Sequence, residues 1–362
     1  MSRLFPLLFL VAGMFAPCPA LADEFDVLRS AVRLTREKAL VRPDQEEAMA
    51  NAVRGYLNTI DPYSSYITAR EYAAVQGAAG RYSGVGMDLL QGPGGVLFCL
   101  PYENSPAERA GIRTGDILYL VEGSPASRYP LLVLEGMIRG NAGDGIRLGI
   151  ASSEGAAEMT VIRAEIRRQD VSLHQDNRLP RIRISRFNEH TKSLLEQHLS
   201  ALPKGVPLVL DLRSNVGGDI ASAVEAAGLF LPENALVVTM EDREGKTKSF
   251  KAAGGAKIAP RPLVLWQDAF TASAAEVFCA ALKDTAAALT VGQRTYGKGI
   301  AQNIIPAGNG DFFVISVGRL YRPGGRAIHQ TGLEADYHVR SRGTNREDGY
   351  MKKSFEALGM ER

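Results

Sequence analysis

Residues 206–219 of this chain read VPLVLDLRSNVGGD. The apolar first half is typical of a buried strand, and the glycine-containing turn after it leads into a helix predicted over 219–231. The same order recurs where a second buried strand, 262–266, precedes a helix over 273–282. Because strands and helices alternate in this way from about residue 166 onward, the sequence predicts an α/β layer protein.

The composition is that of an ordinary globular protein, with 362 residues, 45% of them hydrophobic and 23% charged. It excludes a disordered chain, a collagen-like fibre and a polytopic membrane protein, and the length allows two or three domains. A formal charge of +2, from 42 basic and 40 acidic residues, predicts no nucleic-acid partner. Three cysteines exclude a disulfide scaffold, and Cys99 and Cys279 are expected to be buried free thiols.

The N-terminus is typical of a secretory signal peptide over residues 1–22. Arg3 supplies a positive start, the apolar run 4–16 is too short to span a bilayer, and Ala20-Leu21-Ala22 has the pattern of a cleavage site. An uncleaved anchor and a lipid anchor on Cys18 are the alternatives. We therefore expect export across a bacterial-type inner membrane into the periplasm, with membrane association if the segment is retained.

Residues 25–60 are predicted to be helical. Asp44 and Glu47 have the spacing of a capping box, and the apolar residues that follow repeat at the spacing of one helix face. These residues are Met49, Ala52, Val53, Tyr56 and Leu57. The segment 61–66, DPYSSY, is predicted to end the helix as a turn.

Residues 83–163 are predicted to form a compact unit of short strands and two helices. The segment 104–116, NSPAERAGIRTGD, marks its first helix, with serine as N-cap and proline at N1. This segment and the order of elements resemble a PDZ domain of the bacterial protease type. The resemblance implies a groove that binds the free C-terminus of a protein chain as an added strand. The loop that would hold the carboxylate is then Gly84, Val85, Gly86 and Met87.

Ser273 is the first candidate catalytic residue, because it stands between a buried strand and a helix. One interpretation is structural, since Ser273 and Glu276 have the spacing of a capping box. The other is catalytic, since unpaired N–H groups and the helix dipole favour the negative charge that develops in acyl transfer. The residues alone leave both interpretations open.

Lys298 is the candidate general base, because none of the five histidines stands in a recognisable triad context. A lysine acts as a base only when neutral, so its pKa of ~10.4 has to be lowered by desolvation. If 298–304 is a strand, one of its faces carries Lys298, Ile300, Gln302 and Ile304. Two apolar side chains and one uncharged amide would then lie beside the amine. The alternative is an ordinary surface lysine in a glycine turn.

Two glycine motifs have nucleotide-binding alternatives. Gly84-x-Gly86 could open a dinucleotide fingerprint, but Leu89 replaces the third glycine and no helical pattern follows. The segment 292–298 fits a phosphate loop, but Gly299 replaces the residue that would ligate magnesium, and a strand-like pattern follows. Both departures weaken the nucleotide interpretation.

Together these motifs resemble the carboxyl-terminal processing proteases, which are tail-specific serine peptidases with a serine–lysine dyad. The segments that carry the resemblance are DPYSSY at 61–66, the 104–116 segment, LDLRSNVGG at 210–218, TASAAE at 271–276, TYGKG at 295–299 and YRPGGR at 321–326. The separation of 25 residues between Ser273 and Lys298 is the spacing of nucleophile and base in that family. Two positions depart from its pattern: Tyr63 stands in place of the usual histidine, and Asp336 follows Ala335 rather than proline.

The resemblance implies a role for each matching residue. Ser273 would be the nucleophile, Lys298 the base and Gln302 the third catalytic residue. The oxyanion hole would take one backbone N–H from Ala274 and another from Gly217 or Gly218. The implied core is a ClpP/crotonase-like α/β spiral, with a PDZ domain inserted after a helical N-terminal region.

The predicted organisation is a signal peptide (1–22), a helical N-terminal region with the start of the core (23–82), a PDZ domain (83–165), the tail-specific protease core (166–340) and a C-terminal tail (341–362). The predicted function is an exported endopeptidase that cleaves proteins near their C-termini. No metal or organic cofactor is implied. An adaptor protein and a homodimer through the N-terminal helices are further expectations. The alternatives are a catalytically silent PDZ scaffold and a ligand carrier on the same core.

Overall fold

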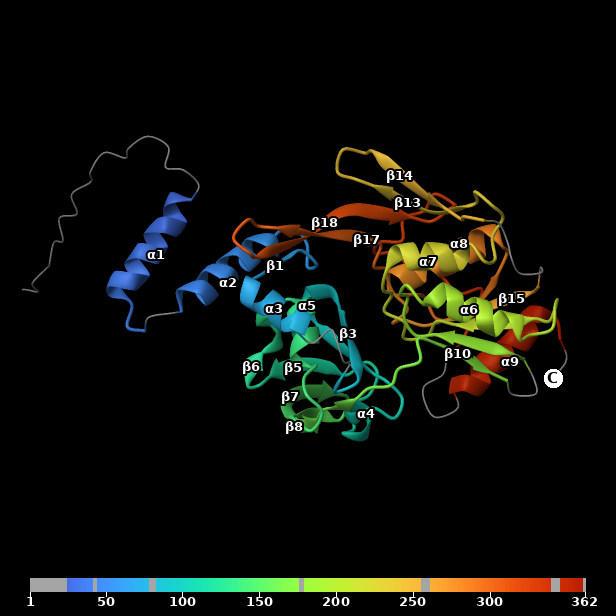
Figure 1. The fold of residues 1–362 in the computed structure, drawn as a ribbon, viewed down its shortest axis with the longest axis horizontal. Coiled ribbons are helices and arrows are strands. Elements are labelled where there is room, and N and C mark those ends of the chain that lie inside the picture. The colour runs from blue at the N-terminus through green and yellow to red at the C-terminus, as the bar shows by residue number, and fades with distance from the viewer. Residues whose placement is uncertain are drawn as a thin grey trace, which may run out of the picture. The chain divides into compact units, whose positions relative to one another are not determined.

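The structure is a computed structural model that describes residues 25–41, 44–77, 83–175, 179–254, 261–339 and 346–360. The predicted signal peptide, residues 1–22, lies outside these ranges. The chain divides into two units, residues 1–49 and residues 50–362, each with its own internal contacts (Figure 1).

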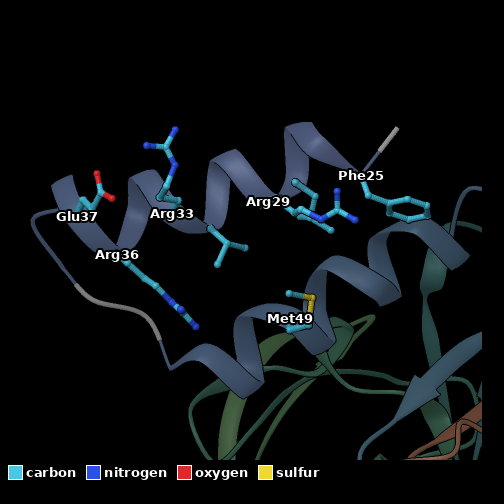
Figure 2. A pocket seen from close by; sticks show the side chains of 8 residues that line it. Phe25, Arg29, Arg33, Arg36, Glu37 and Met49 are labelled. Carbon is cyan, nitrogen blue, oxygen red and sulfur yellow. The ribbon is translucent and has the colours of Figure 1, made fainter. Parts of the chain in front are cut away.

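The first unit contains helix α1 (Asp26–Lys38) and the start of helix α2 (Gln45–Leu57). Asp44 caps α2 as its spacing predicts, since Asp44 Oδ1 accepts the Glu47 N–H at 2.9 Å. The helix predicted over 25–60 is therefore two helices. A hollow of about 680 Å³ in this unit is lined by Phe25, Leu28, Arg29, Val32, Arg33, Arg36, Glu37 and Met49 (Figure 2).

The apolar stripe predicted for α2 is wrong in part. The buried residues of this helix are Ala50, Arg54 and Leu57. Met49 and Tyr56 are instead 41% and 70% exposed. Arg54 is buried because it pairs with Glu71 at 2.5 Å and donates to the Tyr66 carbonyl at 2.9 Å. Hydrophobic periodicity places only apolar residues on the buried face of a helix, so it does not predict that Arg54, with its guanidinium paired, lies there.

The second unit is built on a six-stranded sheet. Its order is β10 (Val171–His174), β11 (Arg181–Ile184), β12 (Leu208–Asp211), β15 (Leu263–Gln267), β16 (Leu289–Gly292) and β19 (Tyr337–His338). Strand β10 is antiparallel to β11, and the other neighbours are parallel. Strands β12 and β15 are buried along their whole length, as expected when both faces of a sheet are covered.

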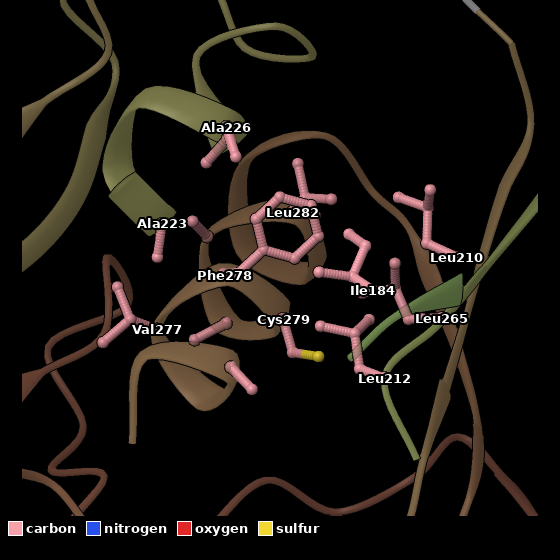
Figure 3. Close-up of a cluster of buried hydrophobic side chains, with 14 of the residues drawn as sticks. Ile184, Leu210, Leu212, Ala223, Ala226, Leu265, Val277, Phe278, Cys279 and Leu282 are labelled. Carbon is pink, nitrogen blue, oxygen red and sulfur yellow. The ribbon is translucent and has the colours of Figure 1, made fainter. Parts of the chain in front are cut away.

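Helices cover both faces of this sheet. One face packs on the cluster formed with α6 (Thr191–Ser200), α7 (Ile220–Ala227) and α8 (Ala274–Thr285). Figure 3 shows Ile184, Leu212 and Leu265 on one side of this cluster and Phe278 and Cys279 of α8 on the other. The other face, with Trp266, packs on α9 (Arg346–Leu358) through Tyr350. The segment predicted as a C-terminal tail therefore includes a helix with buried residues.

A second sheet is antiparallel and combines segments far apart in the chain. Its strands are β1 (Ser65–Ile67), β18 (Phe312–Tyr321), β13 (Leu236–Glu241) and β14 (Thr247–Lys251), and β17 (Ile300–Pro306) also pairs with β18. The pairing of β17 and β18 shifts register between Ala301 and Gln302, which is a β-bulge. The predicted turn at 61–66 thus leads into β1, and β18 joins β1 to β17.

A third sheet has a hydrophobic cluster of its own. Its strands are β3 (Met87–Gln91), β4 (Leu97–Pro101), β5 (Ile117–Val121), β6 (Ser124–Pro125), β7 (Gly145–Ser152) and β8 (Gly155–Ile162). Helices α4 (Pro106–Arg109) and α5 (Leu131–Met137), the 3₁₀ turns η1 (Pro93–Gly95) and η2 (Ala126–Arg128), and the pair β2 (Ser83–Gly84) with β9 (Ala164–Glu165) complete this part. Ser105 Oγ accepts the Glu108 N–H, so the predicted N-cap is confirmed. Helix α3 (Ala69–Gly77) packs on α5, where a Cβ at Gly136 would lie 2.8 Å from Val75.

Candidate active site

Ser273 lies in a strained turn at the start of α8. Its φ of 57° and ψ of −122° are those of the first central residue of a type II′ turn. The Ala275 N–H closes this turn by donating to the Ala272 carbonyl at 3.1 Å. Glycine is the usual residue in this conformation, and another residue costs about 1–3 kcal/mol there. The sequence predicts the helix start but not this strain.

Glu276 is a buried carboxylate that links the serine turn to the lysine segment. Glu276 Oε2 accepts the N–H of Ser273 at 3.0 Å and the N–H of Lys298 at 2.8 Å. Its other oxygen accepts the Gly297 N–H at 2.7 Å and the Thr295 hydroxyl at 2.5 Å. One carboxylate oxygen therefore holds the backbones of Ser273 and Lys298 close together.

Burial raises the pKa of the Glu276 carboxyl to about 7. The hydrogen bonds from Thr295, Gly297, Lys298 and Ser273 oppose this shift, because they favour the charged form. Sequence reasoning identified only the capping role of Glu276. The contacts of Glu276 with residues 295–298 depend on tertiary structure. The sequence signal for them is that the 271–276 segment is followed along the chain by the 295–299 segment.

The glycine turn after β12 lies against Ser273. Gly217 has a φ of 105°, and a Cβ there would lie 2.8 Å from Ser273 Cβ and 2.9 Å from Ala274 N. Only a residue without a side chain permits so close an approach. The Gly217 N–H donates to Asn215 Oδ1 at 2.8 Å, and Asn215 Nδ2 donates to the Ile184 carbonyl at 2.9 Å.

The first half of the 210–218 segment has a structural role. Asp211 is fully buried and pairs with Arg181 at 2.9 Å and with Arg213 at 2.6 Å. The Arg213 guanidinium also lies 4.5 Å from the ring centroid of Trp266. These contacts fix the end of β12 and so orient the glycine turn that follows.

Lys298 lines a cavity of about 690 Å³ in which Gln302, Tyr63 and Glu135 also take part. Lys298 Nζ lies 5.1 Å from the centroid of the Tyr63 ring, and Gln302 Nε2 donates to the Tyr63 carbonyl at 2.8 Å. Burial lowers the pKa of the Lys298 amine, and the Glu135 carboxylate opposes this shift. The cavity thus favours a neutral amine, as a base requires.

The structure places the predicted lysine face differently in one respect. Lys298, Gln302 and Ile304 line the cavity, whereas Ile300 is not among its lining residues. Strand β17 begins only at Ile300, so Lys298 lies in the loop before it and the alternation assumed for 298–304 applies only within the strand. Glu135 and Tyr63 were not predicted to face the amine, since α5 and the 61–66 turn are remote from Lys298 in sequence.

Ser273 and Lys298 are joined through Glu276 but not to each other. Within the described residues, no hydrogen bond connects Ser273 Oγ to Lys298 Nζ, and Ser273 does not line the cavity around the amine. Side chains from the third sheet pack beside the serine turn instead. This apolar cluster contains Leu90, Phe98 and Leu100 on one side and Val216, Phe270, Ala272 and Tyr296 on the other.

Polar contacts also join the third sheet to the core. The Tyr296 hydroxyl donates to the Gln91 carbonyl at 2.8 Å. Asp88 of β3 accepts from Arg168 at 3.2 Å, from Arg186 at 3.1 Å and from the Tyr102 hydroxyl at 2.7 Å. The third sheet is therefore anchored beside the serine turn in this conformation.

The predicted tail-binding loop is enclosed in this conformation. Gly84, Val85, Gly86 and Met87 are all buried. The Val85 N–H donates to the Ile138 carbonyl at 3.2 Å, and a Cβ at Gly86 would lie 2.6 Å from Ser105 Cβ.

Comparison with known proteins places this chain among proteolytic enzymes. Residues 179–339 match the profile of peptidase family S41. The carboxyl-terminal-processing protease of Synechocystis sp. is 31% identical over 317 residues, which cover 84% of this chain and 74% of that protein. The carboxy-terminal-processing protease of Bartonella bacilliformis is 26% identical over 324 residues, covering 87% and 75% respectively.

Among solved structures, the photosystem II D1 C-terminal processing protease is similar in fold. The TM-score is 0.74 at 24% identity, and the match covers 91% of this chain and 90% of that one. The sequence and fold thus define a serine-type peptidase. The chain belongs to peptidase family S41, among the carboxyl-terminal-processing proteases. In the ranges that the structure describes, no helix has the length and apolar character needed to cross a membrane.

Proposed function

We propose that this peptidase is an exported endopeptidase that cleaves protein substrates near their C-termini with Ser273 as nucleophile and Lys298 as base. The observation that carries the proposal is the half-buried Lys298 amine in its cavity. Its pKa is lowered by burial, and its backbone shares one carboxylate oxygen of Glu276 with Ser273. A desolvated lysine whose backbone is tied to the serine turn suits nucleophilic catalysis.

In the proposed reaction, neutral Lys298 Nζ takes the proton of Ser273 Oγ as Oγ bonds to the scissile carbonyl carbon. The resulting Lys298 ammonium then gives this proton to the leaving amine as the C–N bond breaks. Water, deprotonated by the same amine, hydrolyses the acyl-enzyme and regenerates Ser273. Gln302 would orient the lysine segment through its bond to the Tyr63 carbonyl.

The oxyanion of the tetrahedral intermediate would accept hydrogen bonds from Ala274 and from the glycine turn. Ala274 is the first residue of α8, where a backbone N–H has no partner within the helix. Because the Gly217 N–H already bonds to Asn215, Gly218 is the better candidate of the two glycines. The helix dipole of α8 favours negative charge at the same point.

Residues 83–165 are proposed to act as a PDZ domain that binds the substrate tail through Gly84, Val85, Gly86 and Met87. The packing of Leu90 and Phe98 beside Ala272 supports a resting state in which this domain restricts access to Ser273. A bound tail would favour a second conformation in which Ser273 and Lys298 come within hydrogen-bond distance.

The remaining organisation is proposed from the sequence. It comprises a signal peptide at 1–22, an N-terminal region at 23–82, a spiral ClpP/crotonase-like core at 166–340 and a terminal segment at 341–362. Export would place the enzyme in the periplasm. The apolar residues exposed on α1, Val27 and Leu34, are compatible with a homodimer or with an adaptor protein.

Covalent labelling tests the proposed nucleophile. A fluorophosphonate probe should transfer its phosphonyl group to Ser273 Oγ, with loss of fluoride, and label one site per chain by peptide mass spectrometry. Ser273→Ala should abolish the label, whereas Ser193→Ala, on the exposed side of α6, should retain it. No label on Ser273, with or without a peptide that has an apolar C-terminus, would instead support the silent PDZ scaffold.

Amidating the substrate C-terminus tests the proposed tail recognition. The amide lacks the negative charge that loop N–H groups would bind, so we expect kcat/KM to fall about tenfold. The comparison needs two peptides that differ only in this terminal group. A Gly86→Ala variant should reduce the difference, since its Cβ would collide with Ser105. Equal turnover of both peptides by the wild-type enzyme would contradict carboxylate capture.

A further inference from the structure

Tyr63 is held rigidly in the turn that precedes β1. Asp61 Oδ1 accepts the N–H of Tyr63 at 2.7 Å and the N–H of Ser64 at 2.6 Å. Ser64 Oγ donates to Asp61 Oδ2 at 2.8 Å and accepts the Ser316 N–H of β18 at 3.1 Å. The turn is therefore tied both to itself and to the sheet that includes β17.

From this fixed position, two groups of Tyr63 contact the lysine segment. Its carbonyl accepts the Gln302 side chain, and its ring face lies 5.1 Å from Lys298 Nζ. The ring also contacts His329 edge-on, with 6.2 Å between centroids. Burial lowers the pKa of His329, so this neighbour favours its neutral form.

The charged groups around this contact come from several elements. Those that line the same cavity are Glu135 of α5, Arg54 of α2 and Arg128 of η2. Arg54 is already paired with Glu71. Burial raises the pKa of the Tyr63 phenol, with smaller contributions from Asp61 and Glu276, so the phenol is neutral at physiological pH. Glu135 and the ring face of Tyr63 are thus the groups that can favour a cation at Lys298.

A ring face attracts an ammonium ion but has little attraction for a neutral amine. A cation within about 6 Å of the centroid gains ~0.5–2 kcal/mol, with the larger values in desolvated sites. The Lys298 contact falls within this distance. The attraction is therefore weak while Lys298 is a neutral base and becomes strong once it has accepted a proton. An interaction that strengthens along the reaction lowers the barrier.

We propose that Tyr63 is a positioning residue for Lys298: its carbonyl fixes Gln302, and its ring face stabilises the ammonium formed when Lys298 takes the Ser273 proton. This inference rests on the proposed function of Ser273 and Lys298. It gives the 61–66 turn a role in catalysis, although a dyad of Ser273 and Lys298 does not by itself require that turn.

Three substitutions at one position test the inference. Tyr63→Phe keeps the ring, whereas Tyr63→Leu and Tyr63→Met remove it and leave the backbone carbonyl in place. We expect Tyr63→Phe to retain kcat/KM within about twofold and the other two variants to lose about tenfold at the pH plateau. The acid limb of the kcat/KM profile should move to lower pH in both, because the free lysine also loses its cation-stabilising neighbour.

The direction of the pH shift separates this role from simple packing. If removing the ring only loosened the site, water would reach Lys298 and its pKa would rise toward the ordinary value. The acid limb would then move to higher pH. An upward shift, an unmoved limb or an unchanged plateau in Tyr63→Leu and Tyr63→Met would each overturn the inference.

A measurement without turnover keeps this inference distinct from the proposed function. In Ser273→Ala protein labelled with ¹³Cε-lysine, the Lys298 resonance can be titrated directly and assigned by its loss in Lys298→Arg. Adding Tyr63→Leu should lower the measured pKa. If the pKa does not fall while wild-type enzyme is labelled at Ser273, the Tyr63 inference fails and the proposed dyad stands.

Discussion

Replacing Ser273 with alanine is expected to lower kcat/KM for an unfolded protein substrate by about 10⁴-fold or more, because no acyl-enzyme can form. Ser273→Gly should be equally inactive but more stable than Ser273→Ala by about 1 kcal/mol. The φ of 57° and ψ of −122° at this position suit glycine and strain alanine. Guanidinium unfolding of the two variants measures this difference.

Ser193 offers a matched control for both measurements. It lies inside α6, where glycine is less stable than alanine by about 1 kcal/mol. Ser193→Gly should therefore be less stable than Ser193→Ala, the reverse of the order at position 273, and both should remain active. Substantial hydrolysis by Ser273→Ala would contradict the proposed nucleophile. A Ser273→Ala protein at least as stable as Ser273→Gly would contradict the strain.

Replacing Lys298 with methionine is expected to lower kcat by about 10³-fold with little change in KM. Methionine keeps the approximate length and apolar stem of lysine but cannot accept a proton. In the wild-type enzyme, kcat/KM should rise with pH as Lys298 loses its proton and should level off below pH ~10, because burial lowers this pKa. Initial rates from pH 5 to pH 10 provide the profile.

Lys192 is the corresponding control, since it is a half-exposed lysine on α6 whose ion-pair partner is Glu225. Lys192→Met should leave both kcat and the pH profile unchanged. If Lys298→Met keeps most of the activity, or if the wild-type acid limb lies at the pKa of an ordinary lysine, the amine is not the base. The serine would then require a different proton acceptor.

Local sequence patterns predict much of this fold because strand formation and helix capping depend on residues that are close together in the sequence. The buried strands β12 and β15 begin with the apolar runs 208–210 and 263–266, and the N-caps Asp44 and Ser105 stand at their diagnostic spacings. The motif that contains Ser273 is found with the correct strand before it and the correct helix after it. These features need no knowledge of distant residues.

Features that depend on tertiary contacts escape such reasoning. Arg54 is buried only because Glu71 and the Tyr66 carbonyl satisfy its guanidinium. Lys298 lies before β17, which begins at Ile300, so alternation within that strand does not decide which side chains share the cavity with its amine. Glu135 and Tyr63 reach the amine from α5 and from the 61–66 turn, and periodicity within one strand cannot reveal either approach.

The apolar cluster around Leu90, Phe98 and Ala272 sets a minimum free energy for moving the third sheet away from the serine turn. Phe98 meets Phe270 edge-on, with 5.8 Å between ring centroids, so moving β3 and β4 away from the serine turn would hydrate aromatic and aliphatic surface. Each buried side chain of this kind resists exposure by roughly 1.5–3 kcal/mol. A ligand that drives such a movement must therefore bind the moved conformation more tightly than the packed one by at least this free energy. A Leu90→Ala substitution would lower that requirement, so weakly binding ligands would be discriminated less from strongly binding ones.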